Sequence, residues 1–150
     1  LVTDATKRLC SAINEGEPKS TVKYILMNTV GNRNRDLPEK ISFSEKCIIW
    51  LLRLLVPPHI DNEEAADFLR TKIGQNDNTI KWVVVRPSSL IDEEDVSEYK
   101  THSSPTRSAI FNDGKVSRVN VAAFMNKLIT DQNLWEKWKG QMPVIYNKEI

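Results

Sequence analysis

The sequence predicts an α/β fold with a mainly parallel sheet, and three observations support this prediction. Two segments, 21–28 (TVKYILMN) and 80–87 (IKWVVVRP), are apolar almost without a break, which is typical of parallel strands buried on both faces. Segments with helical spacing of apolar residues alternate with these strands along the chain. The chain has 150 residues, 40% of them hydrophobic and 27% charged, so we expect a single domain over residues 1–150 with a core of its own.

The first half of the chain predicts three helices around the first strand. A helix over 4–13 has one apolar face, and the strand over 21–28 follows it. The polar segment 31–40 predicts a loop, because it carries Gly and Asn turn residues. Two further helices are predicted over 44–55 and 62–73. Candidate caps and terminators flank these helices: Ser42 or Ser44, Asp61 or Asn62, Gly16 and Gly74.

The second half predicts the rest of the sheet and one more long helix. Residues 88–106 are polar and are expected to be irregular, and within them 91–106 form a predicted lid or variable loop. Residues 107–111 (RSAIF) predict a short strand. An amphipathic helix is predicted from Val121, capped by Asn120 or Ser117, with a short helical turn and a last strand (PVIYN) after it. Because the chain opens on a helix and its sheet is thin, we expect it to be the C-terminal portion of a larger fold.

Charge and composition exclude several classes of partner. The formal net charge is +1, which predicts no attraction to nucleic acid or to an anionic membrane. The longest apolar run, 47–56, contains Arg53 and falls short of the roughly 20 residues that span a bilayer. This helix is apolar enough for core burial or for half of a homodimer interface. Cys10 and Cys47 are expected to be buried free thiols, which fits the cytoplasm. No His or Cys spacing predicts a metal site.

Polar side chains follow both predicted strands where each strand ends. Asn28 and Thr29 come at the end of the first strand, and Pro87, Ser88 and Ser89 come at the end of the second. The carboxyl ends of parallel strands meet at one edge of a sheet, and ligands bind there in open α/β folds. Proline cannot continue a central strand, so the chain must leave the sheet at Pro87. These residues are candidates for ligand binding, with simple turn formation as the alternative for Asn28 and Thr29.

Three segments together resemble the C-terminal half of a known family. The segments are WVVVRPSSL at 82–90, SRVNVAAFM at 117–125 and VKYILMNTVG at 22–31. They are similar to motifs of the atypical short-chain dehydrogenases/reductases of the NmrA-like, NAD(P)-binding type. The resemblance covers nearly the whole chain. It implies a Rossmann-like three-layer fold, NADP or NAD as the cofactor, and a small-molecule substrate.

The sequence departs from that family at two functional motifs. The glycine-rich fingerprint that cradles the dinucleotide pyrophosphate is absent, since the five glycines are scattered. The catalytic Tyr-x-x-x-Lys is also absent. At its place in the order of the chain stand His59 and Glu63. His59 can donate a proton to a carbonyl, and Glu63 would favour the protonated imidazole. The alternative is that His59 is only a loop residue after two prolines.

The resemblance leads to two functional hypotheses. The first is an NAD(P)-dependent oxidoreductase that transfers hydride to a small carbonyl or quinone, with His59 as the proton donor. In that hypothesis Asn28, Thr29 and residues 87–89 contact the cofactor, and Arg107, beside the predicted lid, meets an anionic substrate or the cofactor phosphate. The second is a non-catalytic regulator or interaction protein that senses NAD(P), which the missing tyrosine and lysine favour.

Overall fold

The computed structural model describes residues 1–39 and 42–148, apart from the side chains of residues 52 and 57. Its main sheet has the strand order β1-β2-β6-β4. The first three strands are parallel and β4 runs antiparallel to β6. This arrangement confirms the predicted α/β fold with a mainly parallel sheet. The strands are β1 Val22–Met27, β2 Ile80–Pro87, β6 Val144–Asn147 and β4 Tyr99–His102.

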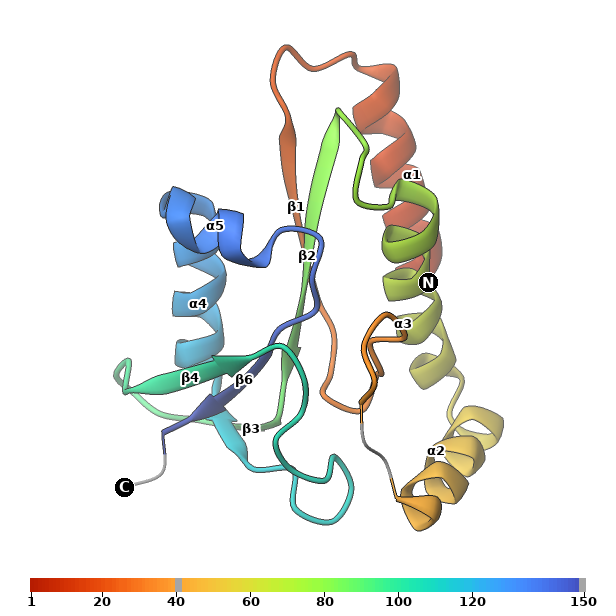
Figure 1. Ribbon diagram of the computed structural model, residues 1–150, viewed down its shortest axis with the longest axis vertical. Coiled ribbons are helices and arrows are strands. Elements are labelled where there is room, and N and C mark those ends of the chain that lie inside the picture. The colour runs from red at the N-terminus through yellow and green to blue at the C-terminus, as the bar shows by residue number, and fades with distance from the viewer. Residues whose placement is uncertain (40–41, 149–150) are drawn as a thin grey trace.

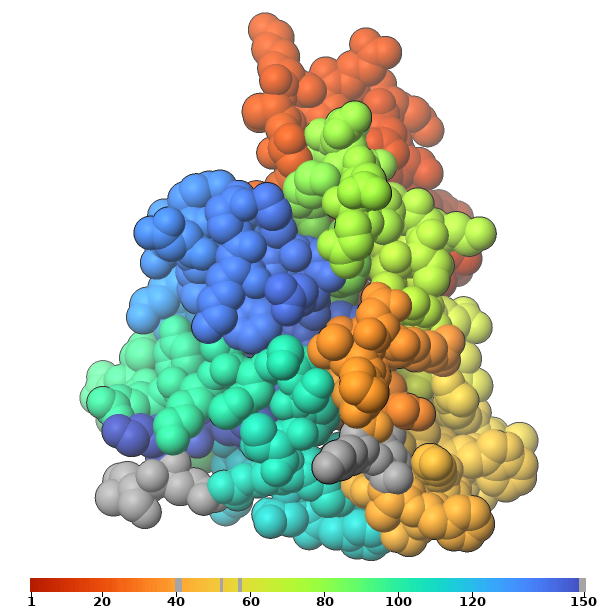
Figure 2. Space-filling model, viewed as in Figure 1, coloured from red at the N-terminus to blue at the C-terminus, as the bar shows by residue number. Residues whose placement is uncertain are grey.

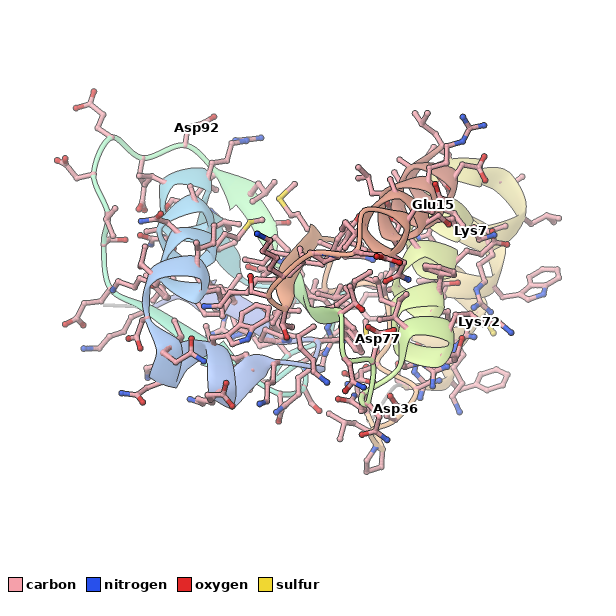
Figure 3. The ribbon with its side chains drawn as sticks, turned by 90° about the horizontal axis from the view of Figure 1, so that it is seen from above. Lys7, Glu15, Asp36, Lys72, Asp77 and Asp92 are labelled. Carbon is pink, nitrogen blue, oxygen red and sulfur yellow. The ribbon has the colours of Figure 1, made fainter. Side chains whose placement is uncertain are left out.

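Helices cover both faces of this sheet and make three layers (Figure 1). On one face lie α1 (Val2–Glu15) and α3 (Pro57–Phe68), the latter continued by a π-helical turn over Leu69–Ile73. On the other face lie α4 (Arg118–Thr130) and α5 (Gln132–Trp138). Figure 3 shows the same three layers seen from above. The remaining helix, α2 (Phe43–Leu55), lies beyond the lower end of α3.

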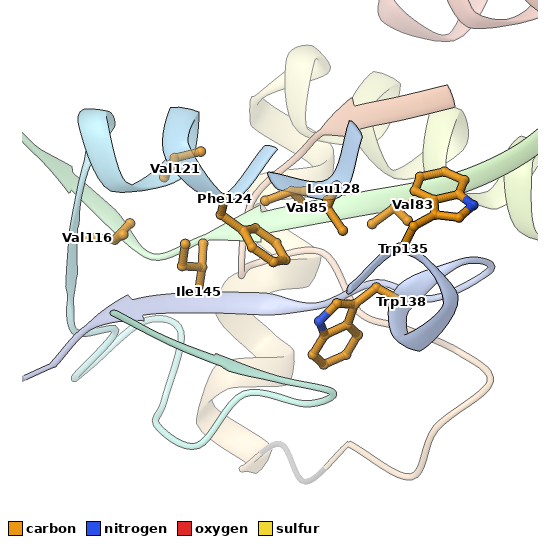
Figure 4. Close-up of a cluster of buried hydrophobic side chains, with 9 residues drawn as sticks. All are labelled: Val83, Val85, Val116, Val121, Phe124, Leu128, Trp135, Trp138 and Ile145. Atoms are coloured by element: carbon orange, nitrogen blue, oxygen red, sulfur yellow. The ribbon is translucent and has the colours of Figure 1, made fainter. Parts of the chain in front are cut away.

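Strand β2 carries the core because it is buried on both sides. Alternate side chains of a strand point to opposite faces, and here Val83 and Val85 pack under α4 and α5 (Figure 4). Ile80, Trp82 and Val84 pack under α1 and α3 instead. Burial on both faces therefore explains the near-continuous apolar run in the sequence, as predicted. The cluster drawn in Figure 4 consists of Val83, Val85, Val116, Val121, Phe124, Leu128, Trp135, Trp138 and Ile145.

The segments after the strands lie side by side at the carboxyl edge of the sheet. Beyond the paired strands, the amide of Asn28 donates to the carbonyl of Val85 at 2.7 Å, and that of Val30 donates to the carbonyl of Pro87 at 2.9 Å. The chain after β1 thus continues alongside the end of β2. In Figure 2 the loop over 30–39 lies at the surface between α2 and the segment around residue 105.

The polar region after β2 differs from its predicted irregular conformation. Residues 89–91 form strand β3, which pairs in parallel with β5 (Lys115–Ser117) in a small second sheet. Residues 99–102 form β4, at the edge of the main sheet. Edge strands tolerate polar side chains because one side of the strand is not paired, so their sequences lack the apolar signal. The short strand predicted at 107–111 is wrong, because residues 109–111 form a turn.

Two helices differ from the predictions, α3 in where it begins and α2 in how much of it is buried. Helix α3 begins at Pro57 rather than at Asp61 or Asn62, since proline is favoured in the first turn, where its missing N–H costs nothing. Helix α2 exposes much of its apolar surface, including Phe43, Trp50, Leu54 and Leu55. Cys47 lies on this exposed side, so its predicted burial is wrong, whereas Cys10 is buried as predicted. No helix in the described residues is long and apolar enough to cross a bilayer.

The two cysteines are expected to react very differently. Burial, with a smaller contribution from Asp77, raises the pKa of Cys10 to about 11, so at pH 8 its thiol is protonated as well as inaccessible. Cys47 is exposed. We expect the native protein to release one equivalent of thionitrobenzoate from Ellman's reagent rapidly, and the second only after denaturation. The Cys47→Ser variant should lose the fast phase; a fast phase that survives would contradict the burial of Cys10.

Candidate functional site

Arg86 holds the loops at the carboxyl edge in place. Its side chain is fully buried at the end of β2 and forms an ion pair with Glu39, with Nη2 2.8 Å from Oε1. It also donates to three backbone carbonyls: Asn32 at 2.9 Å, Met142 at 2.7 Å and Ser103 at 3.1 Å. One guanidinium therefore joins the loop after β1, the loop after β4 and the approach to β6. Sequence reasoning missed this role, although an arginine inside an apolar strand signals a buried partner.

Asn28 fixes the loop after β1 to helix α3. Its Nδ2 donates to the carbonyl of Asn62 at 2.9 Å. Its Oδ1 accepts from the amide of Thr29 at 2.9 Å and from Nδ2 of Asn32. These bonds engage both ends of the amide, so Asn28 positions its neighbours. Thr29 accepts a long bond from the amide of Gly31 at 3.4 Å, which leaves its hydroxyl proton available to a ligand.

His59 lies in the first turn of α3, against the same loop. A β-carbon placed on Gly31 would be 3.7 Å from Cε1 of His59 and 3.9 Å from the side chain of Thr29. The two residues that sequence reasoning paired, His59 and Glu63, are indeed neighbours, with Nε2 3.8 Å from Oε1. Arg53 of α2 binds the other carboxylate oxygen of Glu63, through Nε at 2.7 Å and Nη2 at 2.6 Å. His59 is therefore a helical residue beside the ion pair of Glu63 and Arg53.

The residues after β2 separate into two groups. The carbonyl of Pro87 accepts the amide of Val30, and Ser88 is buried, with a hydroxyl that has no hydrogen-bond partner among the described residues. Ser89 is exposed instead. It begins β3, and its hydroxyl is bonded to Asp113. The edge of the sheet thus brings Pro87 and Ser88 beside Thr29 and Val30, while Ser89 lies in the second sheet.

Arg107 lies close to the loop after β1, and part of the predicted lid belongs to the sheet. Arg107 lines a small hollow together with Val30, Gly31 and Glu39. It also lines a larger one, of about 380 Å³, with His102 and Tyr146. Within the predicted lid, residues 92–98 are exposed, while 99–102 belong to the sheet as β4.

Asn120 fastens the exposed part of the predicted lid. It is fully buried, and its Nδ2 donates to Oγ of Ser97 at 2.8 Å and to Oδ1 of Asn147 at 2.7 Å. Its Oδ1 accepts the amide of Ser97 at 2.9 Å. Ser117 is the cap of α4, since its hydroxyl accepts the amide of Asn120 at 3.2 Å. An aspartate at position 120 could accept the amide of Ser97 but could not donate.

Replacing Asn120 by aspartate is expected to loosen residues 92–98. The substitution removes two donated bonds and brings a carboxylate against Oδ1 of Asn147, at a cost of about 1–3 kcal/mol. Amide hydrogen exchange over 92–98 should become faster, while exchange in β2 changes little. Equal acceleration in both segments would mean that Asn120 supports the whole fold rather than this loop.

Three buried polar atoms at the carboxyl edge have no hydrogen-bond partner among the described residues: Nε2 of His59, Oγ of Ser88 and Oδ1 of Asn32. Buried polar groups are nearly always bonded, so such atoms suit a ligand that completes them. No set of His, Cys, Asp and Glu in the described part of the chain could hold a metal ion. The hydroxyl of Ser88 and the amide oxygen of Asn32 fit a ribose and a carboxamide, whereas the scattered glycines provide no loop for a pyrophosphate.

A mainly parallel sheet between helical layers, with polar loops at its carboxyl edge, is a Rossmann-like α/β arrangement, in which ligands bind at that edge. The chain belongs to the NAD(P)H-binding family, whose model matches residues 3–132. The membership confirms the resemblance to atypical short-chain dehydrogenases/reductases. A comparison with curated proteins finds no match.

Solved structures share the fold at low sequence identity. A protein from Streptococcus pneumoniae described as an NADH-flavin reductase superposes with a TM-score of 0.60 at 14% identity, over 98% of this chain and 64% of its own. An anaerobillin reductase from Escherichia coli O157:H7 gives 0.56 at 18%, over 92% and 56%. A short-chain dehydrogenase/reductase from Veillonella parvula in complex with NADP gives 0.51 at 17%, over 85% and 51%. The chain therefore spans about half to two thirds of the length of these proteins.

Proposed function

We propose that the protein is an NAD(P)H-dependent oxidoreductase and that this chain forms the nicotinamide end of its site. The observation that carries the proposal is the group of buried, unpartnered polar atoms at the carboxyl edge, on His59, Ser88 and Asn32. The family's NAD(P)H-binding description supports the cofactor class. The dinucleotide, when bound, supplies a hydride to the substrate.

The residues of this chain would have three separate roles. Thr29 and Ser88 offer hydroxyls to the ribose or the carboxamide, and Asn28 and Pro87 hold the two loops in register. His59 donates the proton that the carbonyl oxygen takes up when the carbonyl carbon receives hydride. Glu63 lies beside the imidazole that gives up the proton, and Arg53 fixes the orientation of the Glu63 carboxylate. Arg107 would contact the ligand from the rim, with residues 92–98 as the movable cover.

The alternative is a protein that binds NAD(P) without turning it over and acts as a regulator. The absence of Tyr-x-x-x-Lys from the sequence favours this alternative. Both hypotheses fit a cytoplasmic protein. The exposed apolar side of α2 is the surface through which we would expect a homodimer to form.

One pair of assays separates the two functions. NADPH and NADH are titrated by isothermal calorimetry, and their oxidation is then followed at 340 nm over a panel of small carbonyls and quinones. Turnover of any member supports the oxidoreductase, and binding without turnover supports the regulator. No binding of either nucleotide would contradict both.

A further inference from the structure

A cleft of about 370 Å³ lies between the loop after β1, helix α2 and helix α3. Its size is within the range of small-molecule sites. Four of its seven lining residues are basic and one is acidic, and Trp50 of α2 forms an aromatic wall that is 64% exposed. The lining consists of Arg33, Arg35, Lys46, Ile49, Trp50, Arg53 and Glu63.

The charges of this cleft are only partly neutralised. Glu63 neutralises Arg53, and Asp67 of α3 neutralises Arg35. Arg33 donates to the backbone carbonyl of Glu39 at 3.4 Å and has no carboxylate partner among the described residues. Lys46 is exposed and has no carboxylate partner among the described residues. Two cationic groups therefore remain for a ligand, Lys46 on α2 and Arg33 on the loop after β1.

The cleft adjoins the candidate site on two sides. Glu63 lines the cleft and lies 3.8 Å from Nε2 of His59. Arg33 and Ile49 also line the smaller hollow that reaches Val30 and Gly31. A ligand held in the cleft would thus extend toward the proton donor and the carboxyl edge of the sheet.

We infer that the cleft binds the substrate and that the substrate is a planar aromatic compound with an anionic group. The anion is bound by Lys46 and Arg33, because charge-assisted bonds are the strong ones. The ring lies against the exposed face of Trp50, where aromatic stacking adds to the hydrophobic contact. A neutral aliphatic carbonyl would leave both cations unpaired. The substrate role rests on the proposed function, whereas binding in the cleft does not require the dinucleotide.

The test uses tryptophan indole signals in the nitrogen–proton NMR spectrum of the labelled protein, without any nucleotide. The chain has four tryptophans, and three of them, Trp82, Trp135 and Trp138, are buried in the core. The Trp50→Phe variant assigns the fourth signal. The probes are 2-naphthoate, its neutral analogue 2-naphthalenemethanol, and inorganic phosphate.

We expect 2-naphthoate to shift the Trp50 signal in a saturable way and to bind at least about tenfold more tightly than 2-naphthalenemethanol. Lys46→Met should weaken naphthoate binding about tenfold, since one charged bond is lost. Lys7→Met is the matched control, because Lys7 is an exposed lysine on α1 and does not line the cleft. It changes the net charge equally and should leave the affinity unchanged.

Three outcomes would overturn the inference. They are equal binding of the acid and the alcohol, equal effects of Lys46→Met and Lys7→Met, and displacement of naphthoate by phosphate at equal concentration, which would mark a site for phosphate alone. A failure here leaves the nucleotide titrations of the proposed function untouched. Conversely, the cleft can bind naphthoate in a protein that binds no nucleotide, so the two failures are distinguishable.

Discussion

The Arg86→Met variant is expected to lose about 3–5 kcal/mol of its free energy of unfolding. Methionine fills much of the same volume, but it leaves the buried carboxylate of Glu39 without its partner. It also leaves the carbonyls of Asn32 and Met142 without their donor. Domains of ordinary stability have only about 5–15 kcal/mol in total, so this variant should be close to unfolding at 37 °C.

Urea denaturation of three variants would assign this loss to its cause. Glu39→Gln keeps the shape and removes the charge, so its loss should also be large. Combined with Arg86→Met, it should cost less than the sum of the two single changes, because the two groups interact directly. Additive losses, or a loss below about 1 kcal/mol for Arg86→Met, would contradict the role of Arg86 as the centre of the edge loops.

Replacing His59 by alanine is expected to lower the rate of NADPH oxidation by about 10²–10⁴-fold on any substrate that the protein reduces. The reason is that His59 has a buried Nε2 beside the loop where the substrate carbonyl would lie, and no other hydrogen-bond partner for that nitrogen occurs among the described residues. Nucleotide affinity should change little, because Thr29 and Ser88 supply the cofactor contacts in this proposal.

The Glu63→Gln variant separates the proposed role of His59, proton donation, from that of Glu63, which is to position the imidazole. It should lower the rate by a smaller factor than His59→Ala, because the imidazole stays in place and only the carboxylate beside it is replaced by an amide of the same shape. His59→Ala with an unchanged rate would remove His59 from the site. A large fall in nucleotide affinity would instead give His59 a role in binding.

The core strands could be predicted from the sequence because their cause is local. The run at 80–87 is apolar on both faces, and β2 has these bounds. The start of α3 was missed although its signal was present, since two prolines before a helical segment mark its first turn. Strands β3, β4 and β5 could not be predicted, because short edge strands with polar side chains have no apolar alternation to detect.

In the candidate site, too, some residues could be predicted from the sequence and others could not. The strand-end rule predicted that Asn28 and Thr29 would lie beside Pro87 and Ser88, and the backbone bonds between these loops confirm that they do. Ser89 does not lie with these residues, because it belongs to β3, which pairs with β5 in the second sheet. The Arg86–Glu39 pair joins residues 47 positions apart, and no local pattern predicts such a contact. Likewise, an apolar helix such as α2 has the same sequence pattern whether it is buried or exposed.

The most direct test of the central claim is a nitrogen–proton NMR titration with NADPH and with 2′-phospho-ADP-ribose, which lacks the nicotinamide. If this chain forms the nicotinamide end of the site, NADPH should shift the backbone amide signals of Thr29, Gly31 and Ser88, and the fragment should leave them in place. Identical shifts with the two ligands, or shifts confined to residues away from the carboxyl edge of the sheet, would contradict the account.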